Sequence, residues 1–225
     1  MAATIQVTAL QWAPPQFQGQ VRDLAVRWAL EEAGLEYEVR LAGDDLRQSA
    51  DYRRAQPFGQ VPVYTEGDIE LFESGAIVLH IAEKPALPGH TVLLPADPRA
   101  RARAKAWLFA ALNSLDVDIT ALGDIDHWAP NEPWGIARRP ELEQMVRSRL
   151  EILAAQFDHQ PYLAGDFSAA DIMTIMVLRA LRHTTLITGN ATLRAYRDRC
   201  EARPAFQRSL AAQLREYARH APSSN

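Results

Sequence analysis

The amino-acid sequence predicts an α+β N-terminal half, with elements in the order β-α-β-α-β-β-α, followed by an all-helical C-terminal half. Apolar and polar residues first alternate as in a half-buried strand, and apolar residues then recur at helical spacing. A proline-rich stretch ends this mixed pattern, and the chain beyond it carries helical spacing alone. We therefore expect domains at residues 1–84 and 98–225, with a linker at 85–97.

The first strand and helix are predicted on either side of a loop. Alternation places the strand at Ile5, Val7 and Ala9, and Pro14-Pro15 prevents it from continuing. Helical spacing then runs up to Gly34, which should end the helix. Its apolar face carries Val21, Leu24, Ala25 and Trp28, and Arg22, Asp23, Arg27 and Glu31 lie elsewhere on the helix.

A second strand is predicted at Tyr37, Val39 and Leu41, followed by a polar, partly helical connection at residues 43–54. The resulting β-α-β unit should be right-handed, with parallel strands. Small molecules bind beyond the carboxyl ends of such strands, so the loop after the first strand is a candidate ligand site.

Residues 56–76 join two more strands to a helix start. One strand is predicted around Pro62 and its partner at residues 69–72, with Glu66-Gly67 as the turn. Proline cannot donate to a ladder, so Pro62 should lie at a strand start or edge, and a cis Val61-Pro62 bond would turn the Val61 backbone towards a ligand. Ser74 can cap the following helix, whose positive end favours an anion.

The C-terminal half is predicted to contain a series of helices. Asp97-Pro98 should start the first, and Ser168 with Asp171 forms a capping box ahead of a buried helix. The predicted helices span residues 99–115, 141–157, 168–181, 192–202 and 205–220. The arginines at the start of the first helix favour a solvated or dimer-facing stripe over a nucleic-acid surface, because the charge run ends after two turns.

Composition describes an ordinary globular protein. The chain has 225 residues, 48% apolar and 23% charged, with a net charge of −4, so nucleic acid is not an expected partner. No segment is long and apolar enough for a membrane span, and the N-terminus lacks an export pattern. The single cysteine, Cys200, excludes an internal disulfide and fits a reducing, cytoplasmic location.

Three separated motifs resemble the glutathione S-transferase family. They are QPFGQVPVY with LFESGAIVLHIAE, then GDFSAADIMTIMVL, then CEARPAFQRSL. The resemblance covers almost the whole chain and implies a thioredoxin-like first domain, glutathione as co-substrate, no metal, and a homodimer. It also implies transfer of the glutathione thiolate to small hydrophobic electrophiles.

The family's usual thiol donor, a tyrosine, serine or cysteine after the first strand, is missing here. Alignment on the first helix places Gln20 at the usual serine position and Arg22 at the usual cysteine position. These two residues, with Phe17 and the first-helix amides, are therefore the candidates to face the thiol. Gln20 is equally readable as a helix-entry residue. Arg22 is better explained as a solvated helix arginine, and Phe17 as pocket wall rather than core.

The resemblance also implies the residues that hold glutathione. Val61 would pair its backbone with the cysteinyl unit, Pro62 would hold that turn, and Glu73 with Ser74 would bind the γ-glutamyl end. Helix capping by Ser74 and a first-turn acid at Glu73 are the alternatives. Gln60 and one of Arg47, Arg53 or Arg54 would meet the glycine carboxylate.

An electrophile pocket is implied by the family layout, with Trp12, Phe17, Trp107, Ala111 and Arg182 as its candidate residues. Trp107 is equally readable as core, and Arg179 is a further arginine that could reach this pocket. The alternative to an enzyme is a non-catalytic protein of the same fold that binds glutathione or another ligand. A disulfide reductase is disfavoured, because no cysteine occupies the loop.

Overall fold

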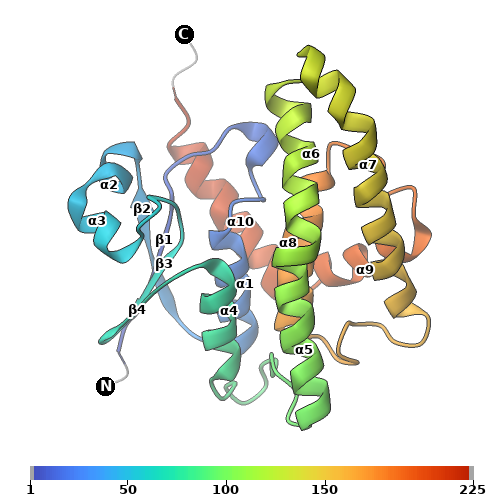
Figure 1. Ribbon diagram of the computed structural model, residues 1–225. Helices are drawn as coiled ribbons and strands as arrows, with labels where there is room; N and C mark the ends of the chain where they lie inside the picture. The colour runs from blue at the N-terminus through green and yellow to red at the C-terminus, as the bar shows by residue number, and fades with distance from the viewer. Residues whose placement is uncertain (1–2, 223–225) are drawn as a thin grey trace. The chain divides into compact units, whose positions relative to one another are not determined.

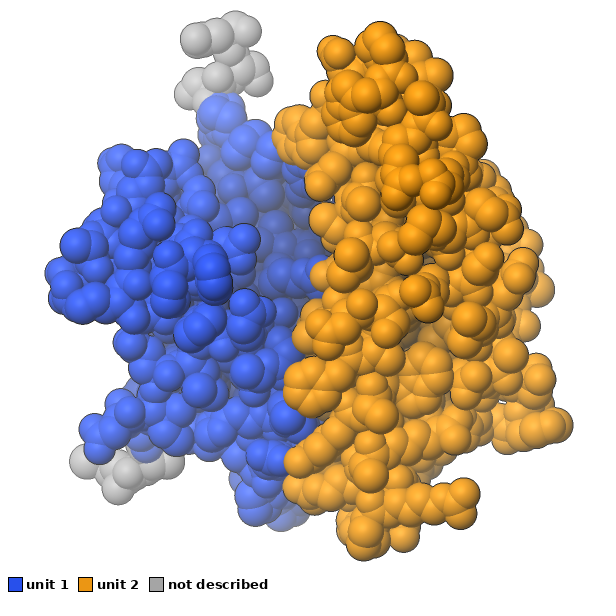
Figure 2. All heavy atoms as spheres, in the orientation of Figure 1, with its two compact units in different colours: residues 1–93, 202–225 blue, residues 94–201 orange. Residues whose placement is uncertain are grey.

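The computed structural model describes residues 3–222. Contacts group the chain into two compact units, residues 1–93 with 202–225 and residues 94–201 (Figure 2). The division proposed from the sequence follows continuous segments, whereas the first unit also takes in the C-terminal helix α10 (Pro204–Arg219). This helix packs against α1 (Asp23–Ala33) of the same unit (Figure 1).

The first unit contains a sheet with the strand order β2-β1-β3-β4. Its remaining elements are β1 (Ile5–Leu10), η1 (Pro15–Phe17), β2 (Tyr37–Ala42), α2 (Asp44–Gln48), α3 (Ala50–Ala55), β3 (Val63–Glu66), β4 (Ile69–Phe72) and α4 (Ser74–Glu83). Strand β1 is parallel to β2 and antiparallel to β3, and β3 is antiparallel to β4. The predicted element order and the parallel first pair are confirmed.

The β3–β4 hairpin differs from the prediction by one residue. Glu66 pairs with Ile69, so the turn is Gly67-Asp68 rather than Glu66-Gly67. Gly67 has φ of 57°, a left-handed conformation that glycine adopts without a steric cost and that two-residue hairpin turns require. Pro62 lies directly before the first residue of β3, so its missing N–H removes no ladder bond.

Helix α1 ends as predicted at Gly34, whose φ is 74° and whose N–H donates to the carbonyl oxygen of Leu30. The predicted polar face of this helix is wrong at two positions. Asp23 and Arg27 are buried, with 0% and 1% of their surface exposed. Their burial follows from the packing of α10 on this face of α1, which sequence periodicity within α1 cannot reveal.

The second unit is helical throughout its described elements. They are α5 (Pro98–Ala110), a π-helical turn η2 (Ala111–Leu115), α6 (Asp116–Trp128), α7 (Pro133–Ala154), η3 (Ala155–Phe157), α8 (Ala169–Leu178), η4 (Arg179–Leu181) and α9 (Ala191–Glu201). Every residue of α8 is buried, as predicted. The predicted box is present, because the Ser168 N–H and hydroxyl both bond Asp171 Oδ2, at 2.9 and 3.0 Å.

Helix α7 starts eight residues before the predicted position of 141. Pro133 is tolerated because the first helical turn needs no amide donor. A side chain at Gly135 would place its Cβ 2.3 Å from the carbonyl oxygen of Ala129, so only glycine permits this close approach. Pro130 and Pro133 predict a loop here, but only Pro130 precedes α7, whereas Pro133 is its first residue and Pro140 lies inside it.

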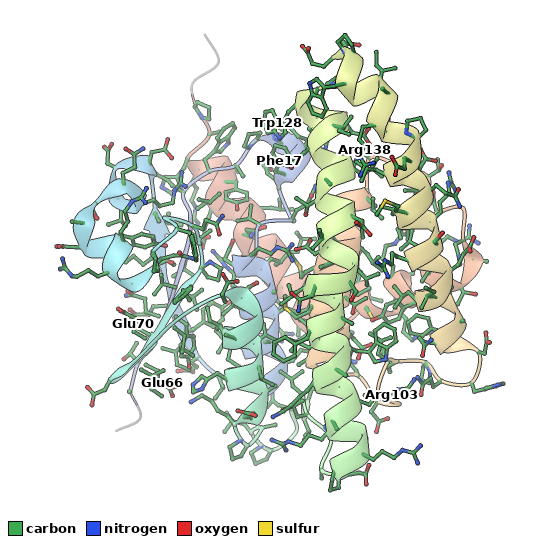
Figure 3. All side chains as sticks on the ribbon, viewed as in Figure 1. Phe17, Glu66, Glu70, Arg103, Trp128 and Arg138 are labelled. Carbon is green, nitrogen blue, oxygen red and sulfur yellow. The ribbon has the colours of Figure 1, made fainter. Side chains whose placement is uncertain are left out.

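Two arginines of this unit have local partners. Arg103, which is labelled in Figure 3, donates to the carbonyl oxygen of Leu163 at 2.8 Å, and Arg179 pairs with Glu201. Both arginines therefore have partners within this unit, and the charge of Arg179 is balanced by Glu201 without an external anion. Across residues 3–222, no helix combines the length and apolar character that crossing a bilayer requires.

Candidate functional site

The sheet register brings three separate segments to one edge of the first unit. Val63, the first residue of β3, pairs with Phe72, the last residue of β4, so Pro62 and Glu73 flank the same end of the hairpin. Strand β1 runs antiparallel to β3 and reaches this edge at its carboxyl end. The edge therefore carries the Val61-Pro62 turn, the start of α4 and the β1–α1 loop (residues 11–22).

The turn before β3 contains the predicted cis Val61-Pro62 bond, which is confirmed. Buried side chains of two other elements hold this turn. The Tyr52 hydroxyl donates to the carbonyl oxygen of Gln60 at 2.7 Å, and Thr8 Oγ1 accepts from the Val63 N–H at 2.6 Å. The two hydroxyls also bond each other at 3.0 Å. Sequence reasoning missed Thr8 and Tyr52, because only the fold places them beside this turn.

The start of α4 has an unusual backbone. Within residues 3–222, Glu73 is the only non-glycine residue with a positive φ, 69°. Such a conformation costs about 1–3 kcal/mol, and strained residues of this kind cluster at functional sites. Glu73 occupies the N-cap position with an exposed side chain, and Ser74 is the first helical residue and is buried. Ser74 therefore does not cap the helix, contrary to one expectation.

The β1–α1 loop is closed by its own hydrogen bonds. The Phe17 N–H donates to the carbonyl oxygen of Pro14 at 2.8 Å, and the side-chain amide of Gln18 donates to that of Ala13 at 2.9 Å. Gln20 Nε2 donates to the carbonyl oxygen of Gln16 at 2.6 Å. One hydrogen of that amide remains available, because a side-chain amide carries two. Arg22 is half-buried at the N-cap of α1.

The three arginines that are candidates to bind the glycine carboxylate of glutathione differ in their surroundings. Arg54 pairs with Asp51 at the exposed surface, and Arg47 pairs with Asp44 while donating to the carbonyl oxygen of Gly59 at 3.3 Å. The Arg53 guanidinium lies against Gly59, next to Gln60, which is exposed. Arg47 and Arg53 therefore lie beside the turn, and Arg54 is engaged elsewhere.

The candidate electrophile residues belong to both units. In the first unit, Trp12 and Phe17 are half-buried in the β1–α1 loop; Phe17 is labelled in Figure 3. In the second unit, Trp107 is half-buried on α5, Ala111 is fully buried, and Arg182 is exposed, with its Nε donating to the carbonyl oxygen of Arg179 at 3.2 Å. Their role as a pocket stays a prediction.

A buried polar cluster between α1 and α10 was not predicted. Arg27 Nε lies 2.8 Å from Asp23 Oδ2, and Arg27 Nη2 lies 2.6 Å from Glu216 Oε2. Burial raises the pKa of the Asp23 carboxyl to about 6, against the attraction of Arg27. The only sequence signal is the spacing of Asp23 and Arg27 by one helical turn.

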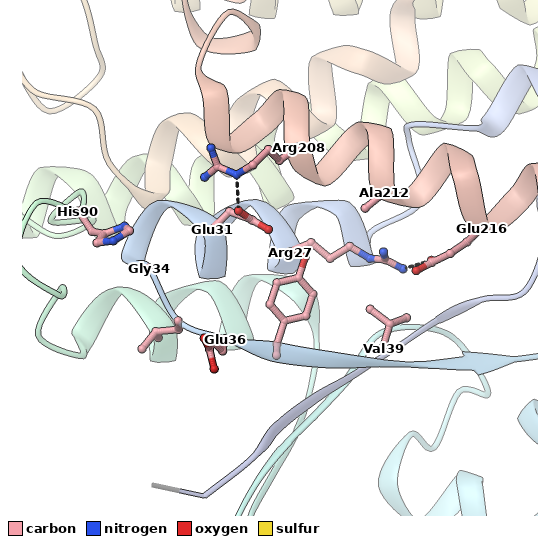
Figure 4. A pocket seen from close by; sticks show the side chains of 11 residues that line it. Arg27, Glu31, Gly34, Glu36, Val39, His90, Arg208, Ala212 and Glu216 are labelled. Carbon is pink, nitrogen blue, oxygen red and sulfur yellow. Dashed lines mark hydrogen bonds and ion pairs between the residues drawn. The ribbon is translucent and has the colours of Figure 1, made fainter.

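Beside this cluster lies an open groove of about 630 Å³ between α1, β2 and α10 (Figure 4). Its lining includes Arg27, Tyr37, His90, Arg208 and Glu216, and none of the predicted site residues. Arg208 bonds Glu31 across its rim at 2.7 Å. Among residues 3–222 no cluster of three or more histidine, cysteine, aspartate or glutamate side chains is placed to hold a metal ion.

Comparison with known proteins gives concordant matches. A family model described as "Glutathione S-transferase, N-terminal domain" matches residues 16–83. Glutathione S-transferase 4 of Zea mays is 34% identical over 190 residues, which cover 79% of this chain and 82% of the relative. Disulfide-bond oxidoreductase YfcG of Escherichia coli is 31% identical over 200 residues, covering 82% of this chain and 88% of the relative.

Solved structures share the fold. A glutathione transferase from Pseudomonas putida, crystallised with one glutathione disulfide bound per subunit, superposes with a TM-score of 0.79. It is 22% identical, and the match covers 92% of this chain and 91% of that protein. The thioredoxin-like N-terminal fold followed by helices is therefore confirmed.

Proposed function

Because the chain belongs to the glutathione S-transferase family, we propose that it joins the glutathione thiolate to small hydrophobic electrophiles. The observation that carries this proposal is the sheet edge at which Val61-Pro62, Glu73-Ser74 and the β1–α1 loop converge. The Val61 backbone would pair with the cysteinyl unit. Glu73 and Ser74 would receive the γ-glutamyl ammonium and carboxylate, and Gln60 with Arg47 or Arg53 the glycine carboxylate.

The chemical step requires a thiolate at neutral pH. A free thiol has a pKa of about 8.5, and each unit of lowering corresponds to about 1.4 kcal/mol in favour of the thiolate. Without a hydroxyl or thiol donor, this lowering would come from Gln20, Arg22 and the amides at the start of α1, which bears partial positive charge. The sulfur would then bond the electrophilic carbon, and a leaving group would depart or the adduct would take up a proton.

We propose Trp12, Phe17, Trp107, Ala111 and Arg182 as the residues that contact the electrophile. We also propose a homodimer in the cytoplasm, where glutathione stays reduced and the one cysteine of the chain needs no partner. Cys200 is buried, which argues against its being a nucleophile.

A second candidate reaction is glutathione-dependent disulfide reduction, because the Escherichia coli relative is named a disulfide-bond oxidoreductase. No cysteine occupies the β1–α1 loop, so both thiols would come from glutathione. The first thiolate would attack the disulfide and release one thiol. A second would attack the glutathione sulfur of the mixed disulfide, forming glutathione disulfide and releasing the other thiol.

The test of the proposed function is the absorbance of bound glutathione thiolate against pH, together with turnover of a generic aromatic electrophile and of 2-hydroxyethyl disulfide. In Gln20→Ala the bound thiol pKa should rise by about one, and in Arg22→Ala by at least as much. Neither variant should lose all activity, because the backbone amides and helix dipole remain. Gln16→Ala is the matched control, since it keeps the carbonyl that Gln20 bonds.

The outcomes separate three functions. Turnover of the aromatic electrophile supports the transferase, and turnover of the disulfide alone supports the reductase. A wild-type bound thiol with the pKa of free glutathione, and no turnover of either substrate, would establish the non-catalytic binding protein instead.

A further inference from the structure

Gln213 of α10 connects the buried cluster of α1 to the β1–α1 loop. Its side-chain Nε2 donates to Asp23 Oδ1 at 2.9 Å, and its Oε1 accepts from the Gly19 N–H at 3.1 Å. Both Gln213 and Asp23 have no exposed surface. The partners fix the orientation of the amide, because a backbone N–H can only donate and a carboxylate accepts.

The rest of the cluster holds Gln213 in place. Glu216 lies one turn further along α10 and pairs with Arg27, which also pairs with Asp23; Figure 4 shows the Arg27–Glu216 pair between the two helices. One face of α10 is therefore fixed to one face of α1 by charged and polar contacts in succession. Such buried networks are rigid when their members are bonded, since each broken contact leaves a polar group without water.

Gly19 lies at the centre of the segment that carries the thiol-facing candidates. It has φ of 75°, and it separates Phe17 and Gln18 from Gln20 and Arg22. The loop bonds described above fix its shape internally, and the Gly19–Gln213 bond fixes it to α10. A displacement of Gly19 would therefore move Gln20 and the amides at the start of α1.

We infer that Gln213 is a positioning residue for the thiol site, through its bond to Gly19. This inference rests on the proposed function. Stabilisation of a thiolate by amides and a helix dipole depends on where they point, and a misplacement of about 1 Å can cost about 100-fold in rate. Because this protein lacks a hydroxyl or thiol donor to the glutathione sulfur, thiolate formation depends more strongly on the positions of Gln20 and the α1 amides.

Two variants test the inference. Gln213→Met keeps the length of the side chain and removes both hydrogen bonds. Gln213→Asn keeps the amide group on a shorter side chain. The matched control is Phe206→Leu, which loosens the same helix at Trp28, 4.8 Å away between ring centroids, and leaves the Gln213 side chain unchanged. Amide exchange of Gly19 by NMR, without glutathione, measures the anchoring. The thiolate absorbance of bound glutathione measures the placement.

Both Gln213 variants should speed exchange at Gly19 about tenfold and raise the bound thiol pKa by about one. Phe206→Leu should lower the melting temperature and leave both quantities unchanged. Unchanged exchange in the Gln213 variants, or an equal thiol shift in Phe206→Leu, would overturn the inference. If Gln213→Met fails to fold, Gln213→Asn decides. A wild-type thiol pKa equal to that of free glutathione would overturn the proposed function, and the exchange comparison would still decide the anchoring.

Discussion

Glu73 and Ser74 are neighbours in sequence but differ in exposure, because the carboxylate is exposed while the hydroxyl is buried. The positive φ of Glu73 produces this difference, since it turns the chain sharply into α4. The γ-glutamyl end of glutathione carries both an ammonium and a carboxylate. The Glu73 side chain would pair with the ammonium, and the N-terminus of α4 would bind the carboxylate. We therefore propose that the strained Glu73 serves recognition of glutathione rather than helix capping.

We predict that Glu73→Ala or Ser74→Ala weakens glutathione binding by about 1.5 to 3 kcal/mol, the loss expected for a charge-assisted hydrogen bond. Calorimetric titration should show a dissociation constant about 10- to 150-fold higher. Glu70→Ala is the control, because Glu70 is an exposed acid on the same hairpin (Figure 3). Unchanged affinity in both site variants would reject this placement of the γ-glutamyl end.

Asp23 should give the protein a distinctive pH dependence. Burial raises its pKa to about 6 from an ordinary 3.8, although Arg27 and Gln213 oppose the rise. The folded state therefore holds this proton more tightly than the unfolded state. The stability contribution of the group is complete below about pH 4 and is lost as pH rises to about 6, by about 3 kcal/mol.

The difference in unfolding free energy between wild type and Asp23→Asn, measured by urea denaturation from pH 4 to 7, should fall over that window and then stay level. Asp126→Asn is the contrasting variant. Burial favours a higher pKa for Asp126, but hydrogen bonds from Arg139 and His183 outweigh it and lower the pKa. Its contribution is therefore complete above about pH 4 and is lost as pH falls further, with the opposite slope, so the Asp126→Asn series is extended down to about pH 2. A flat difference for Asp23→Asn would contradict the assignment.

At the scale of elements, β1 and α3 support the turn that precedes β3. We predict that Thr8→Val, which leaves the buried Val63 N–H without its acceptor, costs about 1–3 kcal/mol of stability. Tyr52→Phe removes the donor to the carbonyl oxygen of Gln60. It should cost less stability than Thr8→Val, because a carbonyl without a partner is tolerated more often than a buried N–H without one. Both should also weaken glutathione binding.

Thermal denaturation and calorimetry together check this prediction. Thr65→Val is a suitable control, because it makes the same substitution on strand β3, where Thr65 pairs with Gln6 of β1 and lies two residues beyond Val63. Full glutathione affinity in both Thr8→Val and Tyr52→Phe would show that the turn keeps its shape without them.

Sequence patterns predicted the elements that depend on local periodicity, including β1, the Gly34 helix end and the Ser168–Asp171 box. They also predicted the Val61-Pro62 bond and the α4 start, because proline and the E-S pair are local signals. They missed contacts between residues far apart in sequence, such as Gln213 with Gly19. The early start of α7 was missed because proline is compatible with a first helical turn, and a loop interpretation is equally consistent with that sequence.

At the scale of the whole molecule, we predict a homodimer. The family resemblance implies one, and α5 carries exposed arginine at Arg99 that acids of a second copy could meet. Sedimentation at micromolar concentration should give a species of twice the 25.1 kDa chain mass. Added salt should shift the equilibrium towards monomer if such charge pairs contribute. A single 25.1 kDa species at low salt would contradict the prediction.

The first unit draws on both ends of the chain, and this has a consequence for biosynthesis. Gly19 and Gln213 are 194 residues apart, so a ribosome adding about 5–20 residues per second needs about 10 to 40 s between them. During that interval Asp23 and Arg27 are synthesised but lack α10. The first unit therefore cannot be completed during synthesis until α10 leaves the exit tunnel. Until then the face of α1 that carries Asp23 and Arg27 stays uncovered. A stop codon before Pro204 would leave that face permanently open.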